Sequence, residues 1–404
     1  MPAKGWFHRI PCRRRLSGRI FFRAPLGTFR YVTGNGAPSN LSGMALPLNH
    51  PITGNELASD WMHRGIDLLN ANTPASLEEA MRCFDEAIAL RRKWPLAENP
   101  RHRYELAAGW MNRGDALARL GAKEQLAESV KSYDEALVLL RSLPLDENPL
   151  FPRRLAIAWI NRGFAVQQQK TAAAGPEAIR CFRKALAVLE DSAATADLHL
   201  LRAGALTNLA GALLNVPGEP TGEARSLAQQ ALALIKEAER NDAVAAEAGF
   251  KARHVLCRAL AAESRDGKSV PPELMAAATD AVDEGLALAR HWEHRGENGF
   301  RALAGDLFRF GCRIHQTGQP RFLAEFILES LDPEKTDGVP PLNQEMHEAA
   351  VAALWNALKE IQQDGFQSLS TPRFGQLLEN LRDLRVTEER LEQLRRTTIH
   401  PKSG

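Results

Sequence analysis

The sequence predicts an all-α protein built from a repeated unit. Long segments of Ala, Leu, Glu and Arg at helical spacing favour helix, and alternating β-branched runs of the kind that form strands are almost absent. Apolar residues make up 44% of the 404 residues and charged residues 25%, a balance that excludes wholesale disorder. A five-residue phrase also recurs, as WMHRG, WMNRG and WINRG, with its tryptophans at a fixed interval of 49 residues. Such a period indicates a repeat array.

A second pattern follows each phrase and predicts a second helix. Fifteen residues after each glycine, a small, a large and a small residue occur at a spacing of four and then three. This spacing places them on one helical face, where the ring can fill the space between two closely packed helices. We expect the glycine to be the point of close approach on the preceding helix, because glycine otherwise costs a helix about 1 kcal/mol relative to alanine. The three sets are Ala80, Phe84 and Ala87; Ser129, Tyr133 and Ala136; and Ala178, Phe182 and Ala185.

These residues resemble the tetratricopeptide repeat, whose pattern is Trp, three residues, Gly, a turn, and then Ala, Phe and Ala at the same spacings. The resemblance covers roughly residues 55–290 and implies a right-handed α-solenoid of stacked helical hairpins. A degenerate sixth pair is expected in GFRALAGDLFRFGCRIHQ and PRFLAEFILESL. Two weaker units come before it, the fourth with Leu206, Ala210, Ala224, Ala228 and Ala231, and the fifth with Val255, Arg258, Ala259, Ala278, Val282 and Gly285.

The period departs from the family, with 49 residues in place of 34. Asn99 followed by Pro100 is typical of an N-cap with proline at the first helical position. We therefore expect a helix at Pro100–Leu120, about 30 Å long at about 1.5 Å per residue, after a second helix near Ser76–Arg92. The hairpins are predicted to be deeper than is usual in the family.

The array is expected to occupy residues 44–330 as five to six helix pairs. Residues 331–342 read as a linker, and residues 343–404 as helices that cap the end of the array, which such arrays require. An alternative is that a C-terminal helix with leucines near heptad spacing pairs with a partner or with a second copy.

Residues 1–43 form a basic segment rich in Gly, Pro and Ser, and we expect it to be disordered. It contains eight Lys and Arg residues, and no Asp or Glu precedes Glu56. Three interpretations stay open: an arm that meets nucleic acid or acidic lipid, a transit peptide, or an extension before a true start at Met44. Without these eight charges, residues 44–404 carry a formal charge of −6 in place of the total of +2, which argues against a nucleic-acid-binding body.

Motifs for catalysis, cofactor binding and membrane insertion are missing from the sequence. It holds no P-loop, no GxGxxG after a strand, no GxSxG and no HExxH, so we expect neither an enzyme nor a cofactor. It also holds no run of eighteen apolar residues to span a membrane. The cysteines are scattered and odd in number, which favours a reducing compartment, the cytoplasm. They are Cys12, Cys83, Cys181, Cys257 and Cys312.

One repeat position carries arginine in four units, at Arg64, Arg113, Arg162 and Arg258. Such a ladder would either bind phosphate or carboxylate groups of a ligand or have a structural role. In the second case, which we favour, the arginines pair with carboxylates on second helices. The candidate carboxylates are Asp85, Glu86, Asp134 and Glu135.

Histidines and cysteines suggest two weaker candidates. The pairs His254 and Cys257, and Cys312 and His315, have helical i, i+3 spacing and would together suit tetrahedral zinc. The alternative, which we favour, is that their helix faces never meet, and we expect no metal. His291 and His294 flank Trp292 near a helix end, where a cluster close to the helix C-terminus is a simpler interpretation than catalysis.

By the resemblance, the first helix of each hairpin lines a concave groove. Its apolar, methionine-containing lining implies a non-enzymatic scaffold that binds a protein segment, as a peptide or a helix. The chain's own C-terminal helices are an alternative occupant, and a nucleic-acid-associated role of the basic residues 1–43 is the alternative function. The sequence leaves the oligomeric state open. The inward positions are Met62, Ile66 and Leu69; Met111, Asp115 and Ala118; and Ile160, Phe164 and Gln167.

Overall fold

A computed structural model describes residues 54–190, 196–263 and 272–296, together with Phe300, Leu303 and Leu307. Within these residues the secondary structure consists of ten α-helices and turns, without a strand, which confirms the all-α prediction for this part of the chain. The basic segment 1–43, the linker 331–342, the capping helices 343–404 and nearly all of the sixth pair lie outside the described residues. The helices are α1 (Gly54–Ala71), α2 (Pro74–Arg91), α3 (Pro100–Leu120), α4 (Lys123–Arg141), α5 (Leu150–Gln168), α6 (Ala174–Glu190), α7 (Ala196–Leu213), α8 (Thr221–Ile235), α9 (Ala243–Glu263) and α10 (Pro272–His294).

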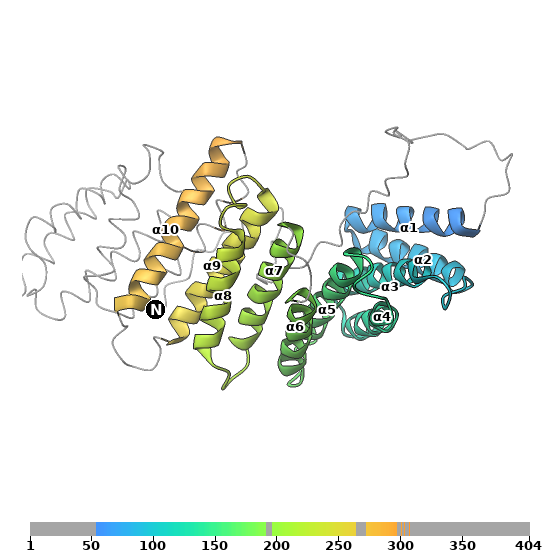
Figure 1. The fold of residues 1–404 in the computed structure, drawn as a ribbon, viewed down its shortest axis with the longest axis horizontal. Coiled ribbons are helices and arrows are strands. Elements are labelled where there is room, and N and C mark those ends of the chain that lie inside the picture. Colours follow the sequence, from blue (N-terminus) through green and yellow to red (C-terminus); the bar gives the residue numbers. More distant parts are fainter. Residues whose placement is uncertain are drawn as a thin grey trace, which may run out of the picture.

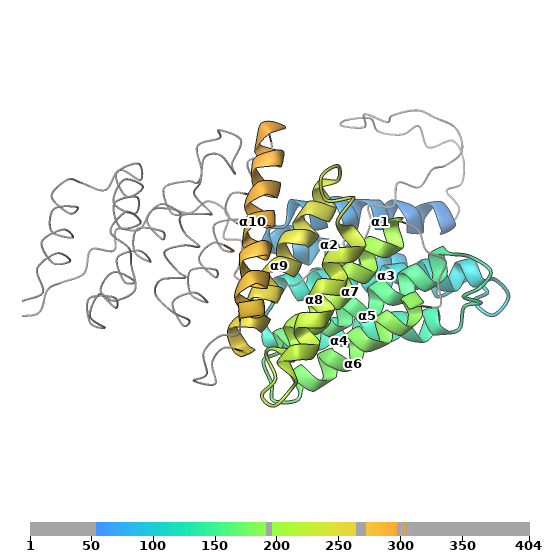
Figure 2. The same ribbon diagram turned by 60° about the vertical axis from the view of Figure 1, so that its left-hand side comes forward.

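The helices pair in chain order into hairpins that stack side by side (Figures 1 and 2). Odd-numbered helices are the first helices and even-numbered helices the second helices of these hairpins. Each second helix also packs on the first helix of the next hairpin, and neighbouring first helices touch from α1 to α9. In Figure 1, α1 lies across the view whereas α7 to α10 stand steeply, so the helix direction turns along the array. The stacked helical hairpins predicted from the period are therefore present.

Local sequence sets the helix ends. Thr73 forms a capping box with Ser76 at the start of α2, where Pro74 occupies the first turn. The Asn99 side chain accepts the Arg101 backbone N–H at 2.9 Å and Pro100 opens α3, as predicted. Helix α3 has 21 residues and ends at Gly121, whose φ of 76° only glycine adopts without strain.

The glycine of each phrase lies against the aromatic ring of the next helix. A Cβ atom added to Gly65 would lie 2.5 Å from Cε1 of Phe84, and one added to Gly163 would lie 2.8 Å from Cε1 of Phe182. At Gly114 the nearest atom, Cζ of Tyr133, would be 3.1 Å away. The predicted close approach is thus confirmed in all three units.

The weaker repeat units also fold as hairpins. Ala224, Ala228 and Ala231 of α8 are fully buried, as are Ala278 and Val282 of α10. A single apolar cluster runs through the array from α3 to α10, and a smaller one fills the first hairpin and reaches α3. None of the helices in the described ranges combines the length and the apolar character needed to cross a membrane.

The glycine contacts predict a specific pattern of stability. Replacing Gly163 with alanine should lower the free energy of unfolding by about 1–3 kcal/mol, because the new methyl group overlaps the Phe182 ring and Cys181 Cβ. Gly222→Ala is the matched control, since nothing lies within 4 Å of that position in α8 and the change should be neutral or stabilising. Urea unfolding measures both. Equal effects of the two substitutions would show that the ring contact does not set the spacing of the helices.

Candidate functional site

The repeated phrase places a tryptophan and an arginine one turn apart on each first helix. The guanidinium carbon lies 5.6 Å from the ring centroid of Trp61 for Arg64, 5.8 Å from that of Trp110 for Arg113, and 6.0 Å from that of Trp159 for Arg162. These distances allow a cation–π attraction in every unit. The tryptophan ring therefore packs against the guanidinium group and limits the directions in which the arginine side chain extends.

Arg113 joins three helices. Its Nε donates to Oδ1 of Asp85 on α2 at 2.7 Å, and its Nη1 donates to Oγ of Ser132 on α4 at 2.8 Å. Only 19% of the Arg113 side chain is exposed, so the charge sits close to its partners. The arginine thus links the second helix of one hairpin to both helices of the next.

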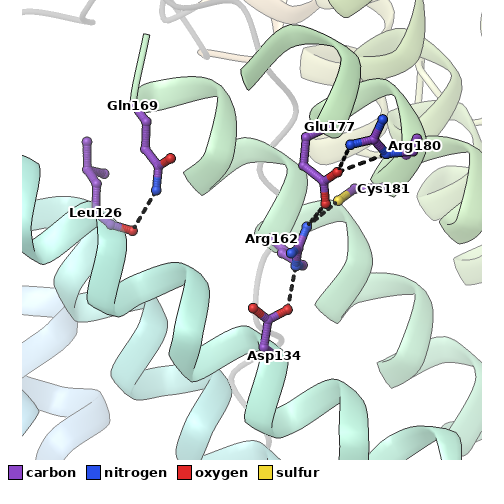
Figure 3. Close-up of polar contacts among 7 residues, drawn as sticks. All are labelled: Leu126, Asp134, Arg162, Gln169, Glu177, Arg180 and Cys181. Atoms are coloured by element: carbon purple, nitrogen blue, oxygen red, sulfur yellow. Dashed lines mark hydrogen bonds and ion pairs between the residues drawn. The ribbon is translucent and has the colours of Figure 1, made fainter. Parts of the chain in front are cut away.

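Arg162 repeats this arrangement one unit later (Figure 3). Its Nε donates to Oδ1 of Asp134 on α4 at 2.6 Å, and its Nη1 donates to Oε1 of Glu177 on α6 at 2.5 Å. The same nitrogen lies 3.0 Å from Sγ of Cys181. Arg180 holds the other oxygen of the Glu177 carboxylate. Arg113 and Arg162 thus pair with Asp85 and Asp134, two of the carboxylates named for the structural interpretation of the ladder.

The two ends of the ladder differ from its centre. Arg64 donates to Glu79 at 2.9 Å, but no described helix precedes α1 to supply a second carboxylate, and 59% of its side chain is exposed. Arg258 donates to Oδ1 of Asn215 at 2.8 Å and forms no ion pair with the described residues. A continuous anion-binding row is therefore not formed, because the central arginines are already neutralised.

Sequence reasoning missed a row of glutamates on the second helices, of which two pair with a ladder arginine: Glu79 with Arg64 and Glu177 with Arg162, whereas Arg113 bonds Ser132 on α4 instead. Fifteen residues after each arginine stands a glutamate, and three residues after that a cation that pairs with it. The signal was available in the sequence, because both positions are chemically constant at the 49-residue period. The glutamates are Glu79, Glu128 and Glu177, and the cations are Arg82, Lys131 and Arg180.

Six of the nine side chains predicted to line the groove are buried between helices. Each first helix packs mainly on the second helices beside it and also touches the neighbouring first helices, so these side chains belong to the core rather than to an open surface. Only Ile66, Phe164 and Gln167 are partly exposed. The buried six are Met62, Leu69, Met111, Asp115, Ala118 and Ile160.

A charged pair occupies the middle of this first-helix face. Oδ2 of Asp115 accepts from Nη2 of Arg119 at 2.9 Å, and Nη1 of Arg119 donates to the Leu69 carbonyl at the end of α1 at 2.8 Å. Farther along, Gln169 at the end of α5 donates to the Leu126 carbonyl at 3.5 Å (Figure 3). Arg119 thus joins α3 to the end of the preceding first helix α1, whereas Gln169 joins the end of α5 to the start of the second helix α4.

Of the two pairs considered for a metal, only His254 and Cys257 lie within the described residues. Cys312 and His315 lie outside them, and no cluster of three or more His, Cys, Asp or Glu side chains suited to a metal occurs in the described part. Burial raises the pKa of the Cys257 thiol to about 12, while the nearby Arg253 charge lowers it by less. In the absence of a metal ion this thiol is therefore protonated at neutral pH.

The histidine cluster near the end of α10 has a structural role. Nε2 of His291 donates to the Arg240 carbonyl at 2.7 Å, and the indole N–H of Trp292 donates to the Glu239 carbonyl at 2.9 Å. The side chain of His294 lies outside the described residues. Both observed contacts attach α10 to the turn between α8 and α9.

The same turn holds a buried ion pair that the sequence did not signal. Both oxygens of Glu239 accept from Arg253, at 2.7 and 2.8 Å, and Arg253 also reaches Glu284 on α10 at 3.0 Å. A Cβ at Gly249 would lie within 2.3 Å of the Glu239 carboxylate, so the glycine makes room for the pair. This bidentate arrangement holds both terminal nitrogens of the buried guanidinium in fixed geometry, while its Nε has no hydrogen-bond partner among the described residues.

Comparisons with known proteins give no family for this chain. No protein-family model matches it, and no curated protein matches its sequence. The function proposed below therefore rests on the geometry of the repeated helices.

The ladder predicts a pH dependence of stability. Burial raises the pKa of Glu177, but hydrogen bonds from Arg180 and Arg162 lower it by more, so its folded-state pKa lies below the ordinary value. The ion pairs thus stabilise the fold above the unfolded-state pKa of about 4.3, and this contribution is lost as the pH falls through the folded-state pKa. Between pH 7 and pH 3, Glu177→Gln should lose less unfolding free energy than the unmodified protein, by up to about 1 kcal/mol. Urea titrations measure the difference. Glu135→Gln, on an exposed position of α4, is the control and should follow the unmodified protein.

Burial of the cysteines predicts low thiol reactivity. Cys83, Cys181 and Cys257 are free and buried, and burial is the main cause that raises the pKa of each thiol. In a variant with Cys12→Ser and Cys312→Ser, a thiol-specific reagent at pH 8 should label these three residues only after unfolding. Rapid labelling of the native protein, or stoichiometric zinc that is lost in Cys257→Ser, would contradict this assignment.

Proposed function

We propose that this chain is a non-enzymatic scaffold of the tetratricopeptide type, which binds a peptide along the first helices of its hairpins. The observation that carries the proposal is a row of three residues, each five positions after the tryptophan of its unit. Ile66 on α1 and Phe164 on α5 are partly exposed apolar side chains, whereas Asp115 between them is buried and paired with Arg119. The row therefore offers two apolar contacts on either side of an ion pair, of which the Arg119 side chain is 26% exposed and the Asp115 side chain is buried.

The spacing of the helices suggests the form of the ligand. Neighbouring helices in contact have axes about 8–10 Å apart, so Ile66 and Phe164 are separated by roughly 20 Å across α3. An extended peptide covers that distance with about six residues, at about 3.3 Å per residue. We infer a ligand that carries two apolar side chains at this spacing, with polar residues between them.

Gln167 supports an extended ligand. It lies one turn after Phe164, and its side-chain amide nitrogen and oxygen have no hydrogen-bond partner among the described residues. An unpaired buried amide costs about 1–3 kcal/mol, so a partner for it would be stabilising. A rotation of the side chain would let this amide bond the N–H and C=O of a peptide main chain.

The compartment inferred for this function is the cytoplasm. Cys83, Cys181 and Cys257 are free thiols in the core, with no disulfide among the described cysteines. Scattered reduced cysteines support a reducing environment for the scaffold and its ligand.

Selection from a random peptide library on the immobilised chain tests this function. The selected peptides should share two apolar residues about six positions apart. Phe164→Lys should weaken their binding at least about tenfold without lowering the melting temperature, because one buried apolar anchor contributes about 1.5–3 kcal/mol. Fluorescence anisotropy with a labelled peptide measures the affinity.

Val138→Lys is the matched control for this experiment. Val138 is an apolar residue of α4 that is 69% exposed but lies on a second helix. Its replacement should leave the affinity unchanged. Equal losses in both variants, or selected peptides that bind Phe164→Lys at full strength, would contradict the proposed site.

A further inference from the structure

The array begins with a first helix that lacks the neighbour present in later units. Helix α3 packs between α2 and α4, and α5 packs between α4 and α6. Helix α1 packs on α2 and touches α3, and no described helix covers its opposite side. On α3, one side is covered by the preceding helix α2. The equivalent side of α1 has no such neighbour among the described residues.

The contacts between α2 and α3 show which residues that side contains. Asp85 accepts from Arg113, the guanidinium carbon of Arg92 lies 4.9 Å from the Trp110 ring centroid, and Arg91 lies 3.8 Å from the Glu105 carboxylate. Ile88 approaches to 3.0 Å from the point where Gly109 would carry a Cβ. The residues of α3 that meet α2 are thus Glu105, Gly109, Trp110 and Arg113.

Subtracting the 49-residue period gives the same positions on α1. They are Glu56, Asp60, Trp61 and Arg64, which we call the α1 end face. Asp60 and Arg64 are exposed, and Trp61 is partly exposed. The contrast is clearest at the arginine, whose side chain is 59% exposed at Arg64 and 19% exposed at Arg113.

The charges of the α1 end face define what fits on it. Arg64 uses Nη2 for Glu79, which leaves the Nε side for a carboxylate in the place that Asp85 takes beside Arg113. Trp61 presents the ring that Arg92 covers on the equivalent Trp110. Asp60 stands at the position of Gly109 in α3, which faces Ile88 of α2. A ligand that docks on the α1 end face is therefore favoured if it carries a cation at the position of Ile88.

The segment that precedes α1 does not supply the missing carboxylate, because the chain holds no Asp or Glu before Glu56. We propose that the α1 end face docks an amphipathic helix of another protein. This helix carries a carboxylate for Arg64, a cation for Asp60 about one turn later and a second cation for Trp61 about two turns after the carboxylate. The bound helix would pack on α1 as α2 packs on α3, and would run antiparallel to α1.

A helix with the sequence of α2 is the probe for this surface. The peptide comprises residues 74–92 with Cys83→Ser, and with Ile88→Lys to match Asp60, and an intramolecular staple keeps it helical. Fluorescence anisotropy should show saturable binding to the full chain. Arg64→Gln in the protein and Asp85→Asn in the peptide should each weaken it about threefold to fivefold, as expected for a partly exposed ion pair.

The two substitutions also form a double-mutant cycle. If Arg64 and Asp85 pair across the interface, the combined loss should be no larger than either single loss. Arg82→Gln is the matched control, because Arg82 is 70% exposed and also pairs with Glu79 but lies on α2 and not on α1. This variant should bind the peptide with unchanged affinity.

Four results would overturn the proposal. The first is the absence of saturable binding, and the second is independent, multiplicative losses in the cycle. The third is a loss caused by Arg113→Gln but not by Arg64→Gln, which would show that the peptide had displaced α2. The fourth is evidence that the occupant of the α1 end face is this chain itself. Such evidence would be either a dimer of the chain that Arg64→Glu dissociates in sedimentation, or peptide binding that requires removal of residues 1–53.

Discussion

The contact between a helix glycine and an aromatic ring sets the distance on which the rest of the array depends. At Gly65, Gly114 and Gly163 the ring of the next helix occupies the space that a methyl group would need. The two helices of a hairpin are thereby held at one close separation, and the small residues beside the ring are buried with it. Because every unit repeats this geometry, each hairpin offers its neighbour the same surface, and stacking can continue from α1 to α6 without local adjustment.

The arginine ladder depends on that spacing and adds orientation to it. Asp85 and Asp134 lie on the helix before the arginine, whereas Ser132 and Glu177 lie on the helix after it, so each bridge is satisfied only when three helices are in register. The tryptophan one turn earlier supports the guanidinium in this position. Glycine, arginine and tryptophan of one short phrase therefore act together at two interfaces, with the second helix of the same hairpin and with that of the preceding hairpin, which is why the phrase recurs as a whole.

The sequence predicted much of the fold because these constraints are local and periodic. The helix Pro100–Leu120, the Asn99 cap, the ring contacts and the pairing of Arg113 with Asp85 all follow from spacing along the chain. The groove was less predictable, because exposure depends on how closely neighbouring first helices pack. Ile66, Asp115 and Phe164 share one repeat position, yet Asp115 is buried and the other two are partly exposed. A position within a unit does not specify the surroundings that the neighbouring units create.

The Trp-x-x-Arg-Gly phrase is lost after α6, and the helices there are joined by different residues. Arg258 occupies the ladder position in α9 but bonds Asn215 and no carboxylate within the described part of the chain, and Arg253 joins α8, α9 and α10 instead. Only 3% of the Arg253 side chain is exposed, and Gly249 makes room for its pair with Glu239. Removing one partner of such a buried pair costs about 3–5 kcal/mol, far more than an exposed pair contributes. Once this network fixes α10 on the α8–α9 turn, the ladder residues of the early units are no longer needed there, and the phrase can be lost while the stacking continues.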